Sequence, residues 1–232
     1  MNNITIDTDI LEAYSPTDQA RYEYRVAIAA AQRGKSDNGY KQLRYYTMYR
    51  LAQHALSRFP HLNLVECGCW HGHSTLMLTS LMGASRSDAR LHVFDSFEGL
   101  SEFQAEDMSP LIATPKARAA ERVNFKSSVE RLRAKVEPFG CVDIHQGWIP
   151  QVFDGVDVGA LSFASIDVDL YGPTLASLAF VYPRLVTGGA IYFDDYGYRN
   201  FPGAKKAVDE YLADVKPALF MKSAAGSAFL VK

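Results

Sequence analysis

The sequence of 232 residues predicts an α/β protein with a doubly wound, mostly parallel sheet. Two observations lead to this prediction. From about residue 61 onward, short apolar runs alternate with segments of helical periodicity, as in consecutive strand–helix–strand units. The runs are apolar at nearly every position, which is typical of parallel strands that helices cover on both faces.

Ahead of this region, residues 1–60 are predicted to form an N-terminal helical arm, distinct from a main domain at 61–232. A polar, irregular start is followed by two segments with helical spacing of apolar residues, and Pro60 ends the second. The expected order in the arm is irregular chain, helix, turn and helix, at 1–18, 19–34, 33–39 and 40–59.

The main domain is predicted to alternate strands with helices, and to finish in a hairpin that adds antiparallel edge strands. Pro110, Pro115 and several acids make residues 99–116 an expected mobile connection. Pro173 suits the first turn of a helix. The expected strands are 62–66, 89–97, 141–148, 160–171 and 188–197, the helices 73–82, 115–136, 173–185 and 202–213, and the hairpin 218–232.

Composition narrows the classes of function. The formal net charge is -2, with no Lys/Arg-rich run, so nucleic acid is not an expected partner. The start resembles no signal peptide, and no apolar stretch reaches the roughly 18 residues of a membrane span, so no membrane partner is expected. Three cysteines, Cys67, Cys69 and Cys141, are too few and too uneven for a disulfide framework. Reduced thiols in a cytoplasmic protein are expected.

The segment VECGCWHGHS (65–74) follows the first predicted strand and places five potential metal ligands within eight residues. Zinc is one interpretation. Structural zinc sites usually pair two such groups, and no second Cys/His pair follows here. The potential ligands are Glu66, Cys67, Cys69, His71 and His73.

The same segment is also a glycine loop that leads into a helix. Gly68 and Gly72 would let the backbone turn tightly and approach a ligand, and the helix N-terminus suits a polar or anionic group. A plain turn without any ligand is the alternative. Later strand ends favour a ligand: Asp95, 29 residues after Glu66, could bind ribose hydroxyls, and Trp148 could lie against an adenine ring. Trp148 taken alone also fits an ordinary core.

Four carboxylates follow the fourth and fifth predicted strands: Asp167, Asp169, Asp194 and Asp195. Neighbouring parallel strands end at the same edge of a sheet, so these groups are expected to lie close together. Like charges at short range repel, and a divalent cation relieves the repulsion. Ligands that are all oxygen favour Mg²⁺ over zinc. The alternative is that one or two of them cap helices or turns.

Together these motifs resemble a known family. VECGCWHGHS (65–74), VFDSFEGL (93–100), HQGWIPQVF (145–153) and IDVDLYGPTLASLAFVYPRLVTGGAIYFDDYG (166–197) are similar to the macrocin O-methyltransferase (TylF/MycF-type) family of class I S-adenosylmethionine-dependent methyltransferases. The resemblance covers about residues 40–213. It implies a Rossmann-like, seven-stranded sheet with a reversed final strand, and S-adenosylmethionine at the strand ends.

The resemblance also implies the residues that would contact this cofactor. Near its methionine part these are Glu66, Gly68, Cys69, Trp70, Gly72 and Ser74. Near its ribose they are Asp95, Ser96 and Phe97, and near its adenine Gly147 and Trp148. A further pair near its carboxylate is Thr47 and Met48.

The implied activity is Mg²⁺-dependent methylation of a hydroxyl on a small molecule, such as a sugar of a natural product. The resemblance implies that Asp194, Asp195 and one acid after the fourth strand hold the metal ion. The position at the strand end favours Asp167 as that ligand, which leaves Asp169 as the base; the reverse assignment of this catalytic pair stays open. His145 and His71 are weaker candidates for the base.

Two other classes of function remain open. One is another nucleotide-binding α/β enzyme such as a dehydrogenase, although the chain lacks G-x-G-x-x-G. The other is a non-catalytic domain that only binds the cofactor. Residues 99–126 are expected to cover the acceptor site, and the arm could pack against a second copy in a homo-oligomer.

Overall fold

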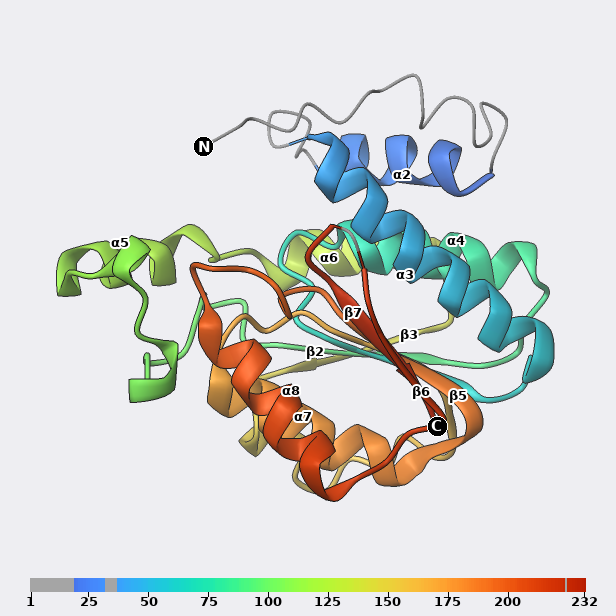
Figure 1. Cartoon of the computed structure of the whole chain (residues 1–232). Helices are drawn as coiled ribbons and strands as arrows, with labels where there is room; N and C mark the ends of the chain where they lie inside the picture. Colours follow the sequence, from blue (N-terminus) through green and yellow to red (C-terminus); the bar gives the residue numbers. More distant parts are fainter. Residues whose placement is uncertain (1–18, 32–36, 224) are drawn as a thin grey trace.

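The computed structural model describes residues 19–31, 37–223 and 225–232. In this part of the chain one sheet of seven strands lies between two layers of helices (Figure 1). The predicted irregular segment 1–18 and residues 32–36 of the predicted turn lie outside the described residues.

The strands are β1 (Asn63–Cys67), β2 (Leu91–Asp95), β3 (Val142–Gln146), β4 (Leu161–Ile166), β5 (Leu185–Phe193), β6 (Leu219–Lys222) and β7 (Ala228–Val231). The α-helices are α2 (Gln19–Ala30), α3 (Gly39–Arg58), α4 (His73–Ala84), α5 (Pro115–Asn124), α6 (Val129–Val136), α7 (Tyr171–Arg184) and α8 (Pro202–Asp214). Short 3-10 turns are η2 (Ala105–Asp107), η3 (Pro110–Ile112), η4 (Glu137–Phe139) and η5 (Gln151–Phe153).

The strand order β3-β2-β1-β4-β5-β7-β6 confirms the doubly wound sheet. β1 to β5 pair in parallel, whereas β7 runs antiparallel to both β5 and β6. The expected closing hairpin and reversed final strand are therefore present. The chain reverses its direction of winding between β1 and β4, and ligands of such sheets bind beyond the carboxyl ends at that point.

Each face of the sheet carries its own apolar core. Leu64 faces a cluster built with α2, α3, α4 and α6, whereas its neighbour Val65 faces a cluster built with α7 and α8. Figure 1 shows these helices above and below the sheet. The residues of β1, β2 and β4 are almost all buried, which explains why these strands read as continuous apolar runs, whereas the edge strands β3 and β6 are more exposed.

The structure corrects several predicted boundaries. The single helix expected at 115–136 is two helices, because Ser128 caps a new N-terminus and Lys126 forms a bridge with Glu98. Residues 99–116, expected as a mobile connection, contain two 3-10 turns and the buried carboxylate of Asp107, which accepts hydrogen bonds from the backbone N–H groups of Gln104 and Tyr171.

Differences at β4 and β5 are smaller. The strand expected to run to residue 171 stops at Ile166. β5 begins at Leu185 instead of residue 188. α7 begins at Tyr171, which leaves Pro173 in its first turn as expected. The four carboxylates therefore lie in the loops just beyond the strand ends.

Candidate functional site

The backbone of the glycine loop after β1 lies in close contact with the residue that follows β4. At Gly68 the backbone has φ of 82°, and a Cβ there would lie 1.8 Å from the carbonyl oxygen of Asp167. The backbone N–H of Asp167 donates to the carbonyl of Cys67 at 2.8 Å. Only glycine permits this approach, so Gly68 places the first of the predicted carboxylates.

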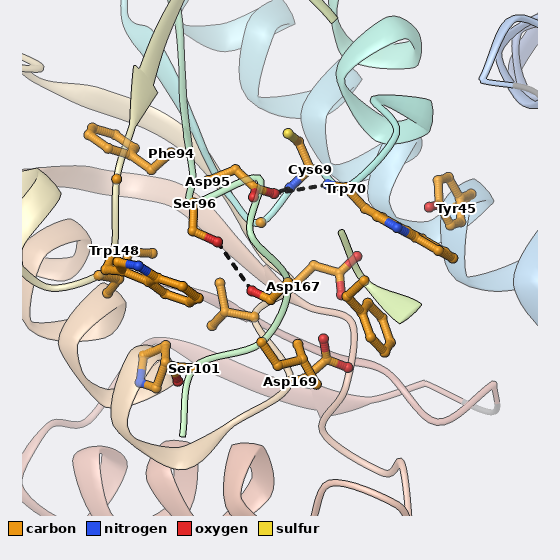
Figure 2. Close-up of a pocket in the computed structure, with 18 residues that line it drawn as sticks. Tyr45, Cys69, Trp70, Phe94, Asp95, Ser96, Ser101, Trp148, Asp167 and Asp169 are labelled. Atoms are coloured by element: carbon orange, nitrogen blue, oxygen red, sulfur yellow. Dashed lines mark hydrogen bonds between the residues drawn. The ribbon is translucent and has the colours of Figure 1, made fainter. Parts of the chain in front are cut away.

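Asp95, at the end of β2, organises the same loop. Its Oδ2 accepts hydrogen bonds from the backbone N–H groups of Cys69 (2.8 Å) and Trp70 (3.0 Å), and its Oδ1 accepts one from Phe97 (2.7 Å). Figure 2 shows Asp95 beside Cys69 and Trp70. One carboxylate thus ties the glycine loop to the residues after β2, and residues of both segments line one cavity.

The space of this first cavity, together with the open solvent at its mouth, is about 710 Å³. Trp148 lies at one end and Tyr45 at the other, with Asp95 and Asp167 between them (Figure 2). An aromatic ring at one end and a carboxylate along the wall suit a long ligand with a flat base and a hydroxylated sugar.

A second, wider cavity of about 1180 Å³ adjoins the first. The two share the side chains of Tyr45, Trp70, Phe125, Asp167 and Asp169 in their linings. A group bound in one cavity would therefore face a group bound in the other across this shared wall.

An acid cluster lines the second cavity: it consists of Asp167, Asp169, Asp194 and Asp195. One carboxylate oxygen each of Asp167, Asp194 and Asp195 lies within 4.8 Å of the others, a spacing that one cation can bridge. Asp169 has a left-handed backbone with φ of 59°, and its N–H donates to Oδ2 of Asp195 at 3.0 Å.

Burial raises the pKa values of Asp167, Asp169 and Asp195 well above the ordinary carboxyl range, and the neighbouring carboxylates raise them further. The charge of Arg44 acts in the opposite direction on all three. The cluster therefore needs positive charge before all of its members can ionise.

Asp194 is held at both of its oxygens. Nη1 of Arg44 lies 2.8 Å from Oδ2, and the hydroxyl of Tyr192 donates to Oδ1 at 2.8 Å. Burial lowers the pKa of Arg44, but the attraction of Asp194 and its neighbours outweighs burial and raises it overall. Arg44 comes from α3, so the predicted arm contributes directly to this site.

The potential zinc ligands of the loop point in different directions. Cys67 packs in the cluster with α7, where burial raises the pKa of its thiol to about 12, while Cys69 packs in the opposite cluster. His73 stacks on Tyr45 with ring centroids 4.1 Å apart, and the ring of His71 lies against Trp70. In the described residues, the potential metal-binding group is formed by the carboxylates instead.

Glu66 lies beneath the loop and is fully buried. Its Oε2 accepts a hydrogen bond from the hydroxyl of Thr75 at 2.5 Å. Burial raises the pKa of Glu66 to about 7, although the hydroxyls of Ser74 and Thr75 lower it. In this structure Glu66 supports the loop from below and does not line either cavity.

The other predicted residues divide between the cavity wall and its surroundings. Those that line the first cavity are Gly68, Cys69, Trp70, Asp95, Ser96, Gly147 and Trp148. Those that lie outside both cavities are Glu66, Gly72, Ser74, Phe97, Thr47 and Met48. Of the candidate bases, Asp169 lines both cavities, whereas His145 and His71 line neither.

Sequence reasoning placed Thr47 and Met48 of α3 near the cofactor but missed the residues at the start of this helix. Asn38, Lys41, Arg44 and Tyr45 recur at helical spacing and all line the second cavity. Charged residues on a helix usually face solvent, so the spacing alone does not single them out. The signal that was available is that Lys41 and Arg44 share the helix face of the apolar Met48.

The fold and the two adjoining cavities place the protein in the class of Rossmann-like α/β proteins to which class I methyltransferases belong. The chain itself belongs to the macrocin O-methyltransferase (TylF) family, whose model matches residues 50–220. The match includes the glycine loop, Asp95 and the whole acid cluster, but it begins after Arg44 and Tyr45.

Two relatives share part of the sequence. The chain is 31% identical over 156 residues to the 8-demethyl-8-(2,3-dimethoxy-alpha-L-rhamnosyl)-tetracenomycin-C 4'-O-methyltransferase of Streptomyces olivaceus, covering 64% of this chain and 57% of the relative. It is 26% identical over 154 residues to the mycinamicin III 3''-O-methyltransferase of Micromonospora griseorubida, covering 64% and 59%. The chain thus matches less than two thirds of the length of each relative.

A solved structure agrees in fold. The structure of the O-methyltransferase NovP superimposes with a TM-score of 0.68 at 23% identity, over 80% of this chain and 78% of that one. Among the described helices, none combines the length and the apolar character that crossing a membrane requires.

Proposed function

We propose that the protein is an S-adenosylmethionine- and Mg²⁺-dependent O-methyltransferase that methylates a hydroxyl of a small molecule, such as a sugar of a natural product. One observation carries the proposal: a cavity suited to a nucleoside opens onto a second cavity that holds an acid cluster, and Asp167 and Asp169 line both. The donor and the acceptor of a group transfer need such an arrangement.

The first cavity fits the cofactor. Trp148 offers a ring for the adenine, and Oδ1 of Asp95, which accepts a single N–H bond, retains acceptor capacity for a ribose hydroxyl. The glycine loop brings backbone close to the ligand, and Cys69 and Trp70 line this part of the wall. S-adenosylmethionine supplies the methyl group when it is bound there.

The acid cluster fits a hard divalent cation. Its potential ligands are all carboxylate oxygens, which Mg²⁺ prefers. Asp194 and Asp195 are buried and Asp167 is half-buried, and the cluster carries more negative charge than Arg44 offsets. Asp167, Asp194 and Asp195 would hold the ion. A cation there lowers the pKa of a nearby acceptor hydroxyl.

The chain's own residues would complete the transfer. Asp169 lines both cavities and could take the proton of the acceptor hydroxyl, since burial raises its pKa and so makes its carboxylate a stronger base. Its left-handed backbone, tied to Asp195, keeps the carboxylate next to the cluster. Tyr45, Trp70 and Phe125 on the shared wall would exclude water from the reacting atoms.

The second cavity suits a sugar or glycoside acceptor. Trp70 and Phe125 lie 5.2 Å apart by ring centroids, and Tyr198 also lines the cavity, so aromatic surface faces the acid cluster. Aromatic rings accommodate the apolar faces of sugars, while carboxylates and a cation engage hydroxyl oxygens. The two relatives described above are named as O-methyltransferases, one of a rhamnosyl-tetracenomycin and one of mycinamicin III, which supports the same class of acceptor.

Calorimetry with S-adenosylhomocysteine, with and without Mg²⁺, would test the cofactor and metal sites. A panel of glycosides with labelled S-adenosylmethionine would test turnover, with Asp194→Asn as the metal-site variant. We expect binding of S-adenosylhomocysteine to persist in the variant and Mg²⁺-dependent turnover to fall by at least about a hundredfold. Unchanged turnover and unchanged EDTA sensitivity in the variant would refute the metal mechanism.

The same experiments separate the alternatives. Binding of NAD in place of S-adenosylhomocysteine would indicate another nucleotide-binding enzyme. Binding of S-adenosylhomocysteine with no Mg²⁺ binding, and no turnover on any glycoside, would indicate a non-catalytic domain.

A further inference from the structure

Arg44 is a half-buried cation that lies against the acid cluster. Its side chain is 19% exposed, and Nη1 lies 2.8 Å from Oδ2 of Asp194. Its charge also acts on Asp167, Asp169 and Asp195. Arg44 precedes the stretch that the family model matches, so membership of the family assigns it no role.

The guanidinium of Arg44 uses only some of its hydrogen-bond donors in this position. Arginine often binds a carboxylate through two parallel N–H bonds, but here the recorded contact with Asp194 is made by Nη1. The buried Nε has no hydrogen-bond partner among the described residues. A buried donor without a partner carries a desolvation cost, so the position of Arg44 beside the cluster does not satisfy all of its hydrogen-bond donors.

Arg44 and a bound metal ion would both use the carboxylate of Asp194. Asp194 is one of the three carboxylates whose spacing suits a metal ion, and it is also the carboxylate that Arg44 binds. A dication and a guanidinium on one carboxylate repel each other strongly where little water screens them. Binding of a metal ion therefore opposes the contact between Arg44 and Asp194, and that contact opposes binding of the ion.

We propose that Arg44 is a built-in counter-cation of the acid cluster, which a divalent ion displaces from Asp194. In the metal-free protein, Arg44 offsets the repulsion among the carboxylates and holds the cluster together. When a metal ion occupies the cluster, the ion takes over that charge, and the guanidinium turns towards the second cavity that it already lines. This inference rests on the proposed metal site.

Tyr192 provides a matched control. Its hydroxyl donates to the other oxygen of Asp194 at 2.8 Å, so Tyr192→Phe removes one contact on the same carboxylate without changing the charge of the cluster. Arg44→Met removes the charge and keeps most of the aliphatic stem. If charge competition is the cause, only the arginine variant tightens metal binding.

The experiment is calorimetric titration of Mg²⁺ into the full chain without S-adenosylmethionine or acceptor, together with melting curves in EDTA. Arg44→Met is expected to bind Mg²⁺ at least about tenfold more tightly than the wild type, because a positive charge next to the ion is gone. Tyr192→Phe is expected to bind it equally or more weakly. In EDTA, Arg44→Met is expected to melt below the wild type, and saturating Mg²⁺ is expected to remove most of that difference.

Arg44→Gln is a second variant without the charge, and its amide can still donate to Asp194. It is expected to tighten Mg²⁺ binding in the same direction, which keeps the test decisive if Arg44→Met does not fold. If the wild type binds Mg²⁺ and the folded charge-free variants bind it no more tightly, the inference is wrong and the proposed function stands. If none of these proteins binds Mg²⁺, the inference and the metal part of the proposed function both fail.

Discussion

Glu66 makes the stability of the protein depend on pH in a direction that can be worked out. Its carboxyl group is fully buried under the glycine loop, and burial raises its pKa from 4.5 to about 7. The folded protein therefore keeps a proton on Glu66 over a range of pH in which the unfolded chain has lost it. Between pH 4.5 and 7 the folded state binds more protons, so the free energy of unfolding falls as the pH rises through this window.

The size of the effect follows from the shift. A shift from 4.5 to about 7 corresponds to about 3 kcal/mol between a pH well below the window and one well above it. Glu66→Gln cannot ionise, and its amide oxygen can still accept the hydrogen bond from Thr75. The variant is therefore expected to gain stability relative to the wild type as the pH rises, by about 2 to 3 kcal/mol between pH 5 and pH 8.5.

Urea denaturation of both proteins at pH 5 and pH 8.5, followed by circular dichroism, measures this difference. Titration of the other acids is common to both proteins and largely cancels in the comparison. A difference between variant and wild type that stays constant with pH, or that shrinks as the pH rises, would refute the reasoning. Metal-free buffer with EDTA keeps occupancy of the acid cluster out of the measurement.

Three further predictions follow from individual contacts. Gly68→Ala should destabilise the fold by at least about 2 kcal/mol and abolish cofactor binding, because its Cβ would meet the carbonyl of Asp167; Gly83→Ala, where a Cβ meets nothing within 4 Å, should instead raise stability by about 0.5 to 1 kcal/mol. Equal melting temperatures for the two variants would contradict this. Asp169→Asn should lower kcat by at least about a hundredfold, while calorimetry shows Mg²⁺ binding weakened by about tenfold or less, as the loss of one nearby negative charge explains; abolished Mg²⁺ binding would make Asp169 a ligand instead of a base. Trp148→Ala should weaken binding of S-adenosylhomocysteine by roughly tenfold without affecting Mg²⁺, which an unaltered dissociation constant for S-adenosylhomocysteine would disprove.

The sheet and the acid cluster could be predicted because their signals are local. An apolar run of five or six residues that ends in an acid identifies both a buried strand and the edge at which its ligand binds. Asp167, Asp194 and Asp195 were found in this way, and the structure brings their carboxylate oxygens together. The role of Gly68 follows from the same logic, since a glycine directly after a strand indicates a close approach of backbone.

Other features depend on contacts between distant parts of the chain. The helical pattern from 115 to 136 continues across Ser128, and the helix is interrupted there because Lys126 pairs with the distant Glu98 and Ser128 caps a new helix. Glu66 stays a predicted cofactor residue; in the structure it is fully buried and lines neither cavity, and its neighbours in sequence do not reveal this burial. Arg44 was missed because a charged helical residue is usually solvated.

The way in which α3 enters the second cavity bears on how the protein could be recombined with its relatives. The family match begins at residue 50, whereas the cavity residues of α3, from Asn38 to Tyr45, lie before it. A chimera joined near residue 50 would keep the glycine loop and the acid cluster and exchange one wall of the second cavity. If that wall selects the acceptor, such chimeras would change substrate preference without rebuilding the catalytic carboxylates, provided that the donor sequence supplies a cation in place of Arg44.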